Sequence, residues 1–293
     1  MSATTSEAHR FRPLVARRSG LLTRHPRITI AALLLGTLAG LAVFAPLITQ
    51  YDPMTLAVTQ RLRPPSAAHW FGTDAYGRDT FSRTIYGGRI SMQIGLSVAA
   101  VSVAIGVVVG MLGGAIRWLD PIVMRISDGL MSIPGILLAI ALMSLTKASV
   151  ATVIIAITIP EVPRVVRLVR SLVLTIREQT YMQAAVSSGT RLPRLMLRHI
   201  LPNVVTPLIV QATYICASAV LIEAYLGFLG AGTPPEVPSW GNIIAENRTF
   251  VQLASWNIMF PGAFLALMVL GVNMLGDGVR DLLDPRLAGR IGK

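Results

Sequence analysis

The sequence is poor in charge. Asp, Glu, Lys and Arg together make up 14% of its 293 residues, whereas a soluble domain usually carries about 25%. Hydrophobic side chains make up 53%, and the mean hydropathy is +0.62. This deficit of charge is too large for an ordinary water-soluble protein, so the composition favours an integral membrane protein.

The sequence also lacks the residues that nucleotide, metal and disulfide chemistry need. A phosphate-binding loop has the pattern G-x-x-x-x-G-K-[ST], and neither lysine, Lys147 or Lys293, stands in such a pattern. The histidines are scattered, and neither H-E-x-x-H nor G-x-S-x-G occurs. Cys216 is the only cysteine, which excludes an internal disulfide and a cysteine-based metal site. We therefore expect no enzyme activity and no metal or cofactor bound by this chain.

Long apolar runs are what the sequence has instead. Runs without any charged residue occupy residues 28–51, 90–116, 200–222 and 249–276. Each is longer than the stretch of about 20 residues that crosses a bilayer core of about 30 Å. Two weaker runs lie between Asp128 and Arg164. We therefore predict an all-α integral membrane protein with six transmembrane helices. The predicted spans are residues 28–48, 92–116, 122–145, 148–168, 204–226 and 255–276.

The positive charges are distributed unevenly between the segments that join these spans. With the N-terminus in the cytoplasm, most arginines fall on cytoplasmic segments, as the positive-inside rule requires. Topology thus explains the net charge of +12, and nucleic-acid binding gains no support from it. We expect both termini in the cytoplasm. The expected organisation is a basic tail at 1–27, a first span at 28–48, an outer loop at 49–89, a membrane-embedded core at 90–281 and a second tail at 282–293.

A short basic segment stands between the fourth and fifth predicted spans. Residues 177–185 favour a helix, Gly189 can take the left-handed conformation that ends it, and Thr190 can cap a second helix. Ala184 and Ala185 leave one patch of the first helix without bulk, which suits insertion into a groove of another protein. The alternatives are a packed turn without a partner and a DNA-binding helix–turn–helix, for which so short a segment leaves little room.

Four acidic residues lie within or beside the predicted spans. Ionisable groups in a membrane are functional candidates, and these are Asp128, Glu161, Glu223 and Asp277. Each lies near the end of a span, so capping or pairing with an arginine is favoured over a proton relay. Glu223 follows Asn203 by about 30 Å of helix, and we expect it to surface near the outer boundary.

The second predicted span carries a run of glycines. Gly106-x-x-x-Gly110 and Gly110-x-x-x-Gly114 overlap, and small residues at this spacing let two helices approach closely. We therefore expect this helix to be buried among its neighbours.

The basic segment has a counterpart in a known family. Residues 183–202 resemble the EAA loop of ABC-importer permease subunits, which couples these subunits to their ATPases. Gln183 stands where the family usually has Glu, and His199 stands where Ile is common. The residues that the resemblance assigns to ATPase coupling are Gln183, Ala184, Ala185, Gly189, Leu201 and Pro202.

Three further segments resemble the dipeptide, oligopeptide and nickel permeases within that family. They are His-Trp-Phe-Gly-Thr-Asp-x-x-Gly-Arg-Asp at 69–79, the stretch 223–241 with its Phe-Leu-Gly-x-Gly-x-Pro-Pro, and Asn-x-x-Gly-Asp-Gly-x-Arg-Asp at 273–281 with the Asp-Pro-Arg that follows. The Gly-Thr-Asp loop is typical of the second of the two permease subunits. The resemblance runs from about residue 20 to residue 287. The residues that it assigns to gating or to the structure of the outer face are Asp74, Arg78, Asp79, Glu223, Trp240 and Gly241.

The resemblance implies a type I ABC importer permease fold with a cytoplasmic coupling helix, in the cytoplasmic (inner) membrane of a prokaryote. The implied partners are a homologous permease, two ABC ATPases that bind ATP and Mg, an extracytoplasmic peptide-binding protein and membrane lipid. The implied solutes are dipeptides or short oligopeptides, with nickel, haem or glutathione as alternatives for the same machinery. An ion-coupled secondary transporter and a membrane-tethered DNA-binding regulator are alternatives of different classes.

Overall fold

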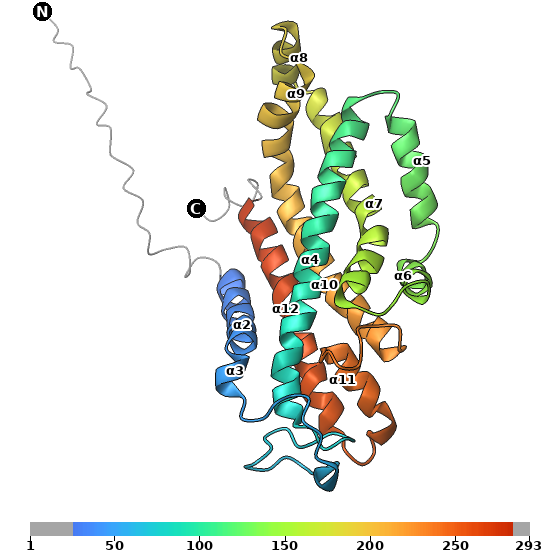
Figure 1. Ribbon diagram of the computed structural model, residues 1–293. Coiled ribbons are helices and arrows are strands. Elements are labelled where there is room, and N and C mark those ends of the chain that lie inside the picture. Colours follow the sequence, from blue (N-terminus) through green and yellow to red (C-terminus); the bar gives the residue numbers. More distant parts are fainter. Residues whose placement is uncertain (1–25, 284–293) are drawn as a thin grey trace, which may run out of the picture.

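The computed structural model describes residues 26–283, and these residues form an all-helical protein (Figure 1). Within that range the β-pairing is limited to one bridge between Thr73 and Asp79. The predicted tails therefore lie almost entirely outside the described residues. The helices are α2 (Pro26–Val43), α3 (Ala45–Ile48), η1 (Val58–Gln60), α4 (Thr80–Ala115), α5 (Asp120–Met131), α6 (Gly135–Ser144), α7 (Val150–Arg177), α8 (Thr180–Ser187), α9 (Leu192–Leu195), η2 (Met196–Ile200), α10 (Leu201–Phe228), α11 (Trp240–Asn247), η3 (Arg248–Phe250) and α12 (Trp256–Leu283).

α4 is the central helix, and it is longer than the predicted span 92–116. It starts at Thr80 because the side chain of Asp79 accepts a hydrogen bond from the backbone N–H of Ser82 and caps the first turn. Its glycines face α7 at close range: a Cβ atom at Gly110 would lie 2.8 Å from the carbonyl oxygen of Val166. Gly106, Gly110 and Gly114 are all buried, which confirms the expected burial for the glycine face of this helix, whereas Leu96 and Val108 on its other sides are exposed.

The all-α membrane architecture is confirmed, while the count of six spans stays a prediction. Four helical segments are long and apolar enough to cross a bilayer: 26–43, 80–115, 192–228 and 256–282. The pair formed by α5 and α6 adds a fifth if it counts as one span. α7 is long enough at 28 residues, but its second half is rich in arginine.

Two of the predicted spans are bent or interrupted. The predicted span 122–145 consists of α5 and α6, which meet at 83° across a short break that contains Pro134. The predicted span 28–48 is interrupted at Phe44, and the short helix α3 follows with Pro46 in its first turn. Proline has no N–H to donate to the preceding turn, so each break falls where a proline stands.

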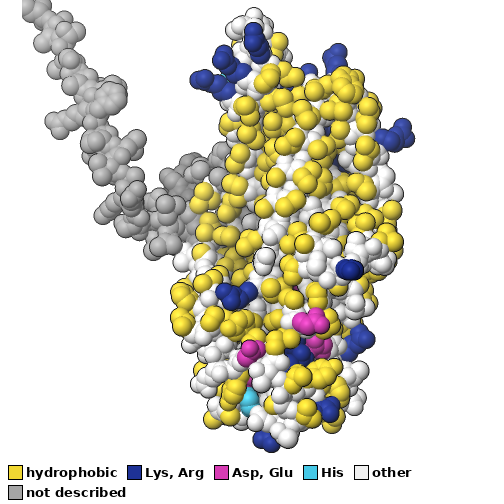
Figure 2. Space-filling view, viewed as in Figure 1, with side chains coloured by type: hydrophobic (Ala, Val, Ile, Leu, Met, Phe, Trp, Pro, Cys, Tyr) yellow, Lys and Arg dark blue, Asp and Glu magenta, His cyan; other side chains and the backbone are white. Residues whose placement is uncertain are grey.

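The molecule has two different ends. Figure 1 places α11 and the loop 49–79 at one end, and α8 with α9 at the other. Figure 2 shows apolar side chains over the middle of the molecule, with Lys and Arg side chains at both ends and acidic side chains visible near the α11 end. Arg27, at the start of α2, forms an exposed ion pair of 3.4 Å with Asp281 near the end of α12. The first and last described helices therefore meet where the described chain begins and ends.

Candidate functional site

The Gly-Thr-Asp loop forms a tight turn around a carboxylate. Gly72 and Gly77 adopt φ values of 72° and 76°, in the left-handed region that glycine enters without a steric penalty. Between them, one carboxylate oxygen of Asp74 accepts hydrogen bonds from the backbone N–H groups of Tyr76 and Arg78, at 2.8 and 2.9 Å. The turn thereby directs the second carboxylate oxygen toward α4.

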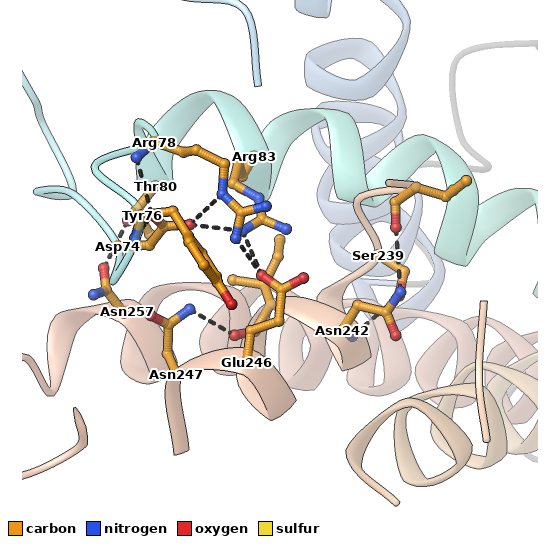
Figure 3. A network of polar contacts seen from close by, with 12 residues as sticks. Asp74, Tyr76, Arg78, Thr80, Arg83, Ser239, Asn242, Glu246, Asn247 and Asn257 are labelled. Atoms are coloured by element: carbon orange, nitrogen blue, oxygen red, sulfur yellow. Dashed lines mark hydrogen bonds and ion pairs between the residues drawn. The ribbon is translucent and has the colours of Figure 1, made fainter. Parts of the chain in front are cut away.

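That second oxygen belongs to a buried cluster of four charges, which we call the Asp74 cluster (Figure 3). Asp74 accepts from Arg78 Nε and from Arg83 Nη1, both at 2.7 Å. Arg83 Nη1 also donates to Glu246 of α11 at 2.7 Å, and Arg78 pairs with the same Glu246 oxygen. Asp74 is 1% exposed and Arg83 is fully buried. Two acids and two bases thus tie the loop, α4 and α11 together.

Two members of the Asp74 cluster were absent from the predicted site. Arg83 belongs to the segment after the loop, and Glu246 is the one acidic residue of α11. Periodicity could have found Arg83, because it lies one turn after Asp79 on the buried side of α4. Nothing in the sequence joins Glu246 to the loop, since its ion pairs with Arg78 and Arg83 span 168 and 163 positions and depend on how α11 packs.

Asp79 serves a second set of contacts at the same end. Besides capping α4, it lies 2.9 Å from His69 Nδ1, and His69 Nε2 lies 2.8 Å from Gln60. Next to it, Thr80 donates to the side-chain oxygen of Asn257 in α12 at 2.6 Å. The structure therefore brings Asp74, Arg78 and Asp79 together, as expected from one loop, and anchors them to three helices.

Glu223, Trp240 and Gly241 also come together, although they belong to different helices. Glu223 of α10 is fully buried, so the expectation that it surfaces at the outer boundary is wrong. Ser91 of α4 donates to one of its oxygens at 3.2 Å, and the other oxygen has no hydrogen-bond partner among the described residues. Trp240 donates from its indole N–H to the carbonyl of Thr84 at 2.9 Å. α11 fills the space that would otherwise let this carboxylate reach water.

Gly241 is required by the same close packing. A Cβ atom at this position would lie 2.6 Å from Ala224 Cα in α10, so no other residue fits without moving one of the helices. The predicted outer-face residues thus divide into two groups that both contact α4. One is the Asp74 cluster, and the other consists of Glu223, which contacts Ser91, and Trp240, which contacts Ser91 and Thr84. Their roles in gating remain a prediction.

The predicted coupling segment forms α8, α9 and η2. The helix expected at 177–185 begins later, at Thr180, because α7 continues to Arg177. Gly189 adopts φ 77° after α8, in agreement with its expected left-handed conformation. The expected cap at Thr190 is wrong: Arg191 occupies the N-cap position of α9 without a side-chain hydrogen bond. Leu201 and Pro202 lie in the first turn of α10.

α8 exposes the small-residue patch and buries its other side. Gln183 and Ala184 are exposed, Ala185 is half-buried, and Met182 is 2% exposed. Met182 and Gln183 line a groove of about 330 Å³ with Leu195, Ile200 and Ala115. Arg177, at the end of α7, donates to the carbonyl of Gly114 at 2.8 Å. The segment therefore rests on the ends of α4 and α7 and leaves one surface open.

The described residues offer no metal centre. Between residues 26 and 283 no group of three His, Cys, Asp or Glu side chains is arranged to hold an ion.

Comparison with known proteins agrees with this architecture. Residues 102–289 match the family described as "Binding-protein-dependent transport system inner membrane component". A probable peptide ABC transporter permease protein of Sinorhizobium fredii is 51% identical over 90% of this chain and 90% of its own. A dipeptide transport system permease protein of Alkalihalophilus pseudofirmus is 43% identical over 84% of this chain and 82% of its own. A probable D,D-dipeptide transport system permease protein of Escherichia coli is 41% identical over 92% and 91%.

A looser likeness is found among solved structures. An inward-facing conformation of the MetNI methionine ABC transporter overlaps with a TM-score of 0.48 at 18% identity, over 66% of this chain and 94% of that chain. This overlap is too loose to transfer residue positions.

Proposed function

The chain belongs to the family of inner membrane components of binding-protein-dependent transport systems, and from this we propose that it is the second permease subunit of an ATP-driven importer of dipeptides or short oligopeptides. The single observation that carries the proposal is the 51% identity, over 90% of the chain, with a probable peptide ABC transporter permease. Family membership makes it a multi-pass protein of the inner membrane and a permease rather than a catalyst.

ATP and Mg would bind to separate ATPase subunits, and α8 would dock into them. The support is the shape of α8, whose exposed Ala184 offers a surface that another chain can approach closely. On its opposite side, Met182 is buried against the ends of α4 and α7. A push on α8 would therefore reach two long helices without passing through a flexible linker, apart from the turn at Glu178 and Gln179.

The other partners would be a homologous permease beside this one and a peptide-binding protein at the α11 end. Because the Asp74 cluster fixes the loop 49–79 to α4 and α11, this end offers a rigid surface to such a protein. Both termini would lie in the cytoplasm, since the start of α2 and the end of α12 meet through Arg27 and Asp281.

The test is transport by the reconstituted complex. The chain is co-expressed with its homologous permease and its ATPases, placed in proteoliposomes and supplied with the peptide-binding protein. We expect ATP-dependent uptake of a labelled dipeptide, and none when the ATPases are omitted. Uptake of a nickel chelate, haem or glutathione in place of any peptide would overturn the peptide assignment. Uphill uptake by this chain alone would overturn the importer assignment.

A further inference from the structure

α7 exposes two different kinds of surface along its length. In its first half the exposed side chains are apolar, as at Ile155, which is 58% exposed. In its second half four of the exposed side chains are Arg164, Arg167, Ser171 and Thr175. These four follow one another at spacings of three or four residues, so they lie on one face of the helix. We call them the α7 polar face.

With α7 as the fourth predicted span, the outer part of the α7 polar face lies at membrane depth. Ser149 caps the start of α7, and its neighbour Ala148 lines a pocket with Phe228 and Glu246, at the α11 end of the molecule. From Ser149 to Arg164 the helix rises about 22 Å. The hydrocarbon core of a bilayer is about 30 Å thick. A span that begins near Ser149 therefore holds Arg164 inside the inner half of the membrane.

Arg164 is held toward the membrane centre and away from the nearer surface. Its Nη1 donates to both carboxylate oxygens of Glu161, at 3.0 and 3.2 Å, and Glu161 lies one turn closer to the α11 end. The Glu161 side chain is only 2% exposed and lies 3.5 Å from the hydroxyl of Ser218 in α10. An arginine that faced lipid would extend its guanidinium to the headgroups instead. The protein thus fixes this charge at depth.

The Arg164 guanidinium is nevertheless open. Its side chain is 53% exposed, and among residues 26–283 only Nη1 is engaged, so Nε and Nη2 remain free to donate. Arg167 is 49% exposed and pairs with Asp128 of α5 at 2.7 Å. Charged groups at this depth face a water-filled cavity or other protein, because lipid cannot solvate them. The α7 polar face is therefore not a lipid-facing surface.

We propose that the α7 polar face lines the water-filled path of the solute, and that Arg164 binds the carboxylate of the solute as it passes. The carboxylate part rests on the proposed function, since every unblocked peptide ends in a carboxylate. A guanidinium donates two parallel hydrogen bonds to a carboxylate. Glu161 neutralises part of the charge of Arg164, so the solute is held weakly enough to leave, as conduction requires.

The path is tested first by chemical labelling of the whole complex in membranes. Arg167→Cys and Ile155→Cys are compared, because both positions lie within about 30 Å of Ser149 along α7 and so inside the bilayer core. The thiol at each position is exposed to a charged, membrane-impermeant reagent, and its labelling is measured by mass spectrometry. The buried native Cys216 is common to both. We expect Arg167→Cys to react about tenfold faster or more, because the reactive thiolate forms only in contact with water. Equal, slow labelling at both positions would overturn the path, since it would mean that another chain or lipid covers the α7 polar face.

The role of Arg164 is tested by uptake of two dipeptides that the wild-type complex transports, one with a free carboxylate and one with a C-terminal amide. Each variant is compared with wild type on the same peptide, so that selection by the external binding protein cancels. We expect Arg164→Gln to lower uptake of the free peptide about tenfold and of the amide less than about twofold. Arg164→Lys should recover part of the loss.

Equal loss for both peptides would overturn the carboxylate contact and leave Arg164 a structural partner of Glu161. If the wild-type complex transports no peptide at all, the proposed function and the carboxylate contact fail together. The labelling of Arg167→Cys would still decide whether the α7 polar face is in contact with water. Failure of the path and failure of the peptide assignment are thus distinguishable.

Discussion

The two ends of the molecule are held in opposite ways. At the α11 end, Asp74 and Arg83 are buried in an ion-pair network that joins a loop to two helices. At the α8 end, Gln183 and Ala184 lie exposed on a short helix that is anchored through Met182. The buried charges of the first end are paired with one another, while the second end leaves a surface open for another protein. Substitutions at the first end should therefore change folding, and substitutions at the second should change assembly.

The Asp74 cluster also fixes α11 in one position at its end of the molecule. Each buried charge has lost its hydration, and only its partners compensate for that loss. The cluster therefore has one favourable arrangement, which fixes α11 against α4. Because α11 is fixed in this position, its residues Trp240 and Gly241 pack over Glu223, and Glu223 is not exposed to water.

The largest loss of folding stability is expected from Arg83→Met. This change removes the arginine that bridges Asp74 and Glu246 and leaves a buried carboxylate with one partner fewer. Loss of one member of a buried ion pair typically costs about 3–5 kcal/mol. We expect thermal unfolding of the purified complex to shift to markedly lower temperature and the yield of folded complex to fall.

The matched control is Arg89→Met, which removes an exposed arginine from the same helix. We expect its unfolding temperature to stay close to that of wild type. If the two variants unfold alike, the Asp74 cluster is not what fastens the α11 end.

A smaller loss of stability is expected from a substitution in α4, the helix that connects the two ends. Gly110→Ala places a Cβ 2.8 Å from the Val166 carbonyl oxygen, whereas Gly36→Ala meets no atom within 4 Å. Overpacking of this kind costs about 1–3 kcal/mol, and alanine in an open helix position is better than glycine. Chemical unfolding of both variants should show Gly110→Ala destabilised and Gly36→Ala unchanged or slightly more stable. The reverse order would contradict the close contact of α4 with α7.

The sequence predicts these regions with unequal success. The apolar runs predict the long helices, and Gly106, Gly110 and Gly114 predict the close packing of α4, because both patterns are local. The bend between α5 and α6 cannot be predicted from the number of apolar residues, although Pro134 stands at the bend. The start of α4 was placed too late because its first turns carry polar side chains such as Arg83, which only a tertiary partner makes compatible with burial.

The candidate site was predictable where one loop carries it. Asp74, Arg78 and Asp79 lie within a single turn, so their proximity follows from the chain itself. Glu246 could not be found, because no local pattern links it to that turn. Glu223 was expected at the surface because helix length alone placed it near the outer boundary. Instead, α11 packs over the end of α10 through the hydrogen bonds of Trp240 to α4, and Glu223 is buried beneath it.

At the α8 end, Gly189→Val tests conformation alone. No atom lies within 4 Å of the site of its Cβ, but the backbone has φ 77°, which costs a β-branched residue about 1–2 kcal/mol. We expect only a small change in unfolding temperature and a clear loss of co-purified ATPase, because the orientation of α8 after its last turn is disturbed. Gly189→Asn tolerates the left-handed conformation and should retain the ATPase. A loss that is equal in both variants would mean that the turn itself, rather than its conformation, contacts the partner.

The smallest effect on folding is expected from Ala184→Trp. Ala184 is exposed, so the free energy of unfolding should stay within about 0.5 kcal/mol of wild type. The same bulk should prevent the close approach of the ATPase, which we expect to be lost on affinity purification of this chain. Ala67→Trp places an equal bulk on an exposed alanine of the loop at the opposite end, and it should retain the ATPase. If Ala184→Trp keeps its ATPase while Ala67→Trp loses it, the ends have been assigned the wrong way round, because the open surface of α8 would then contribute nothing to docking.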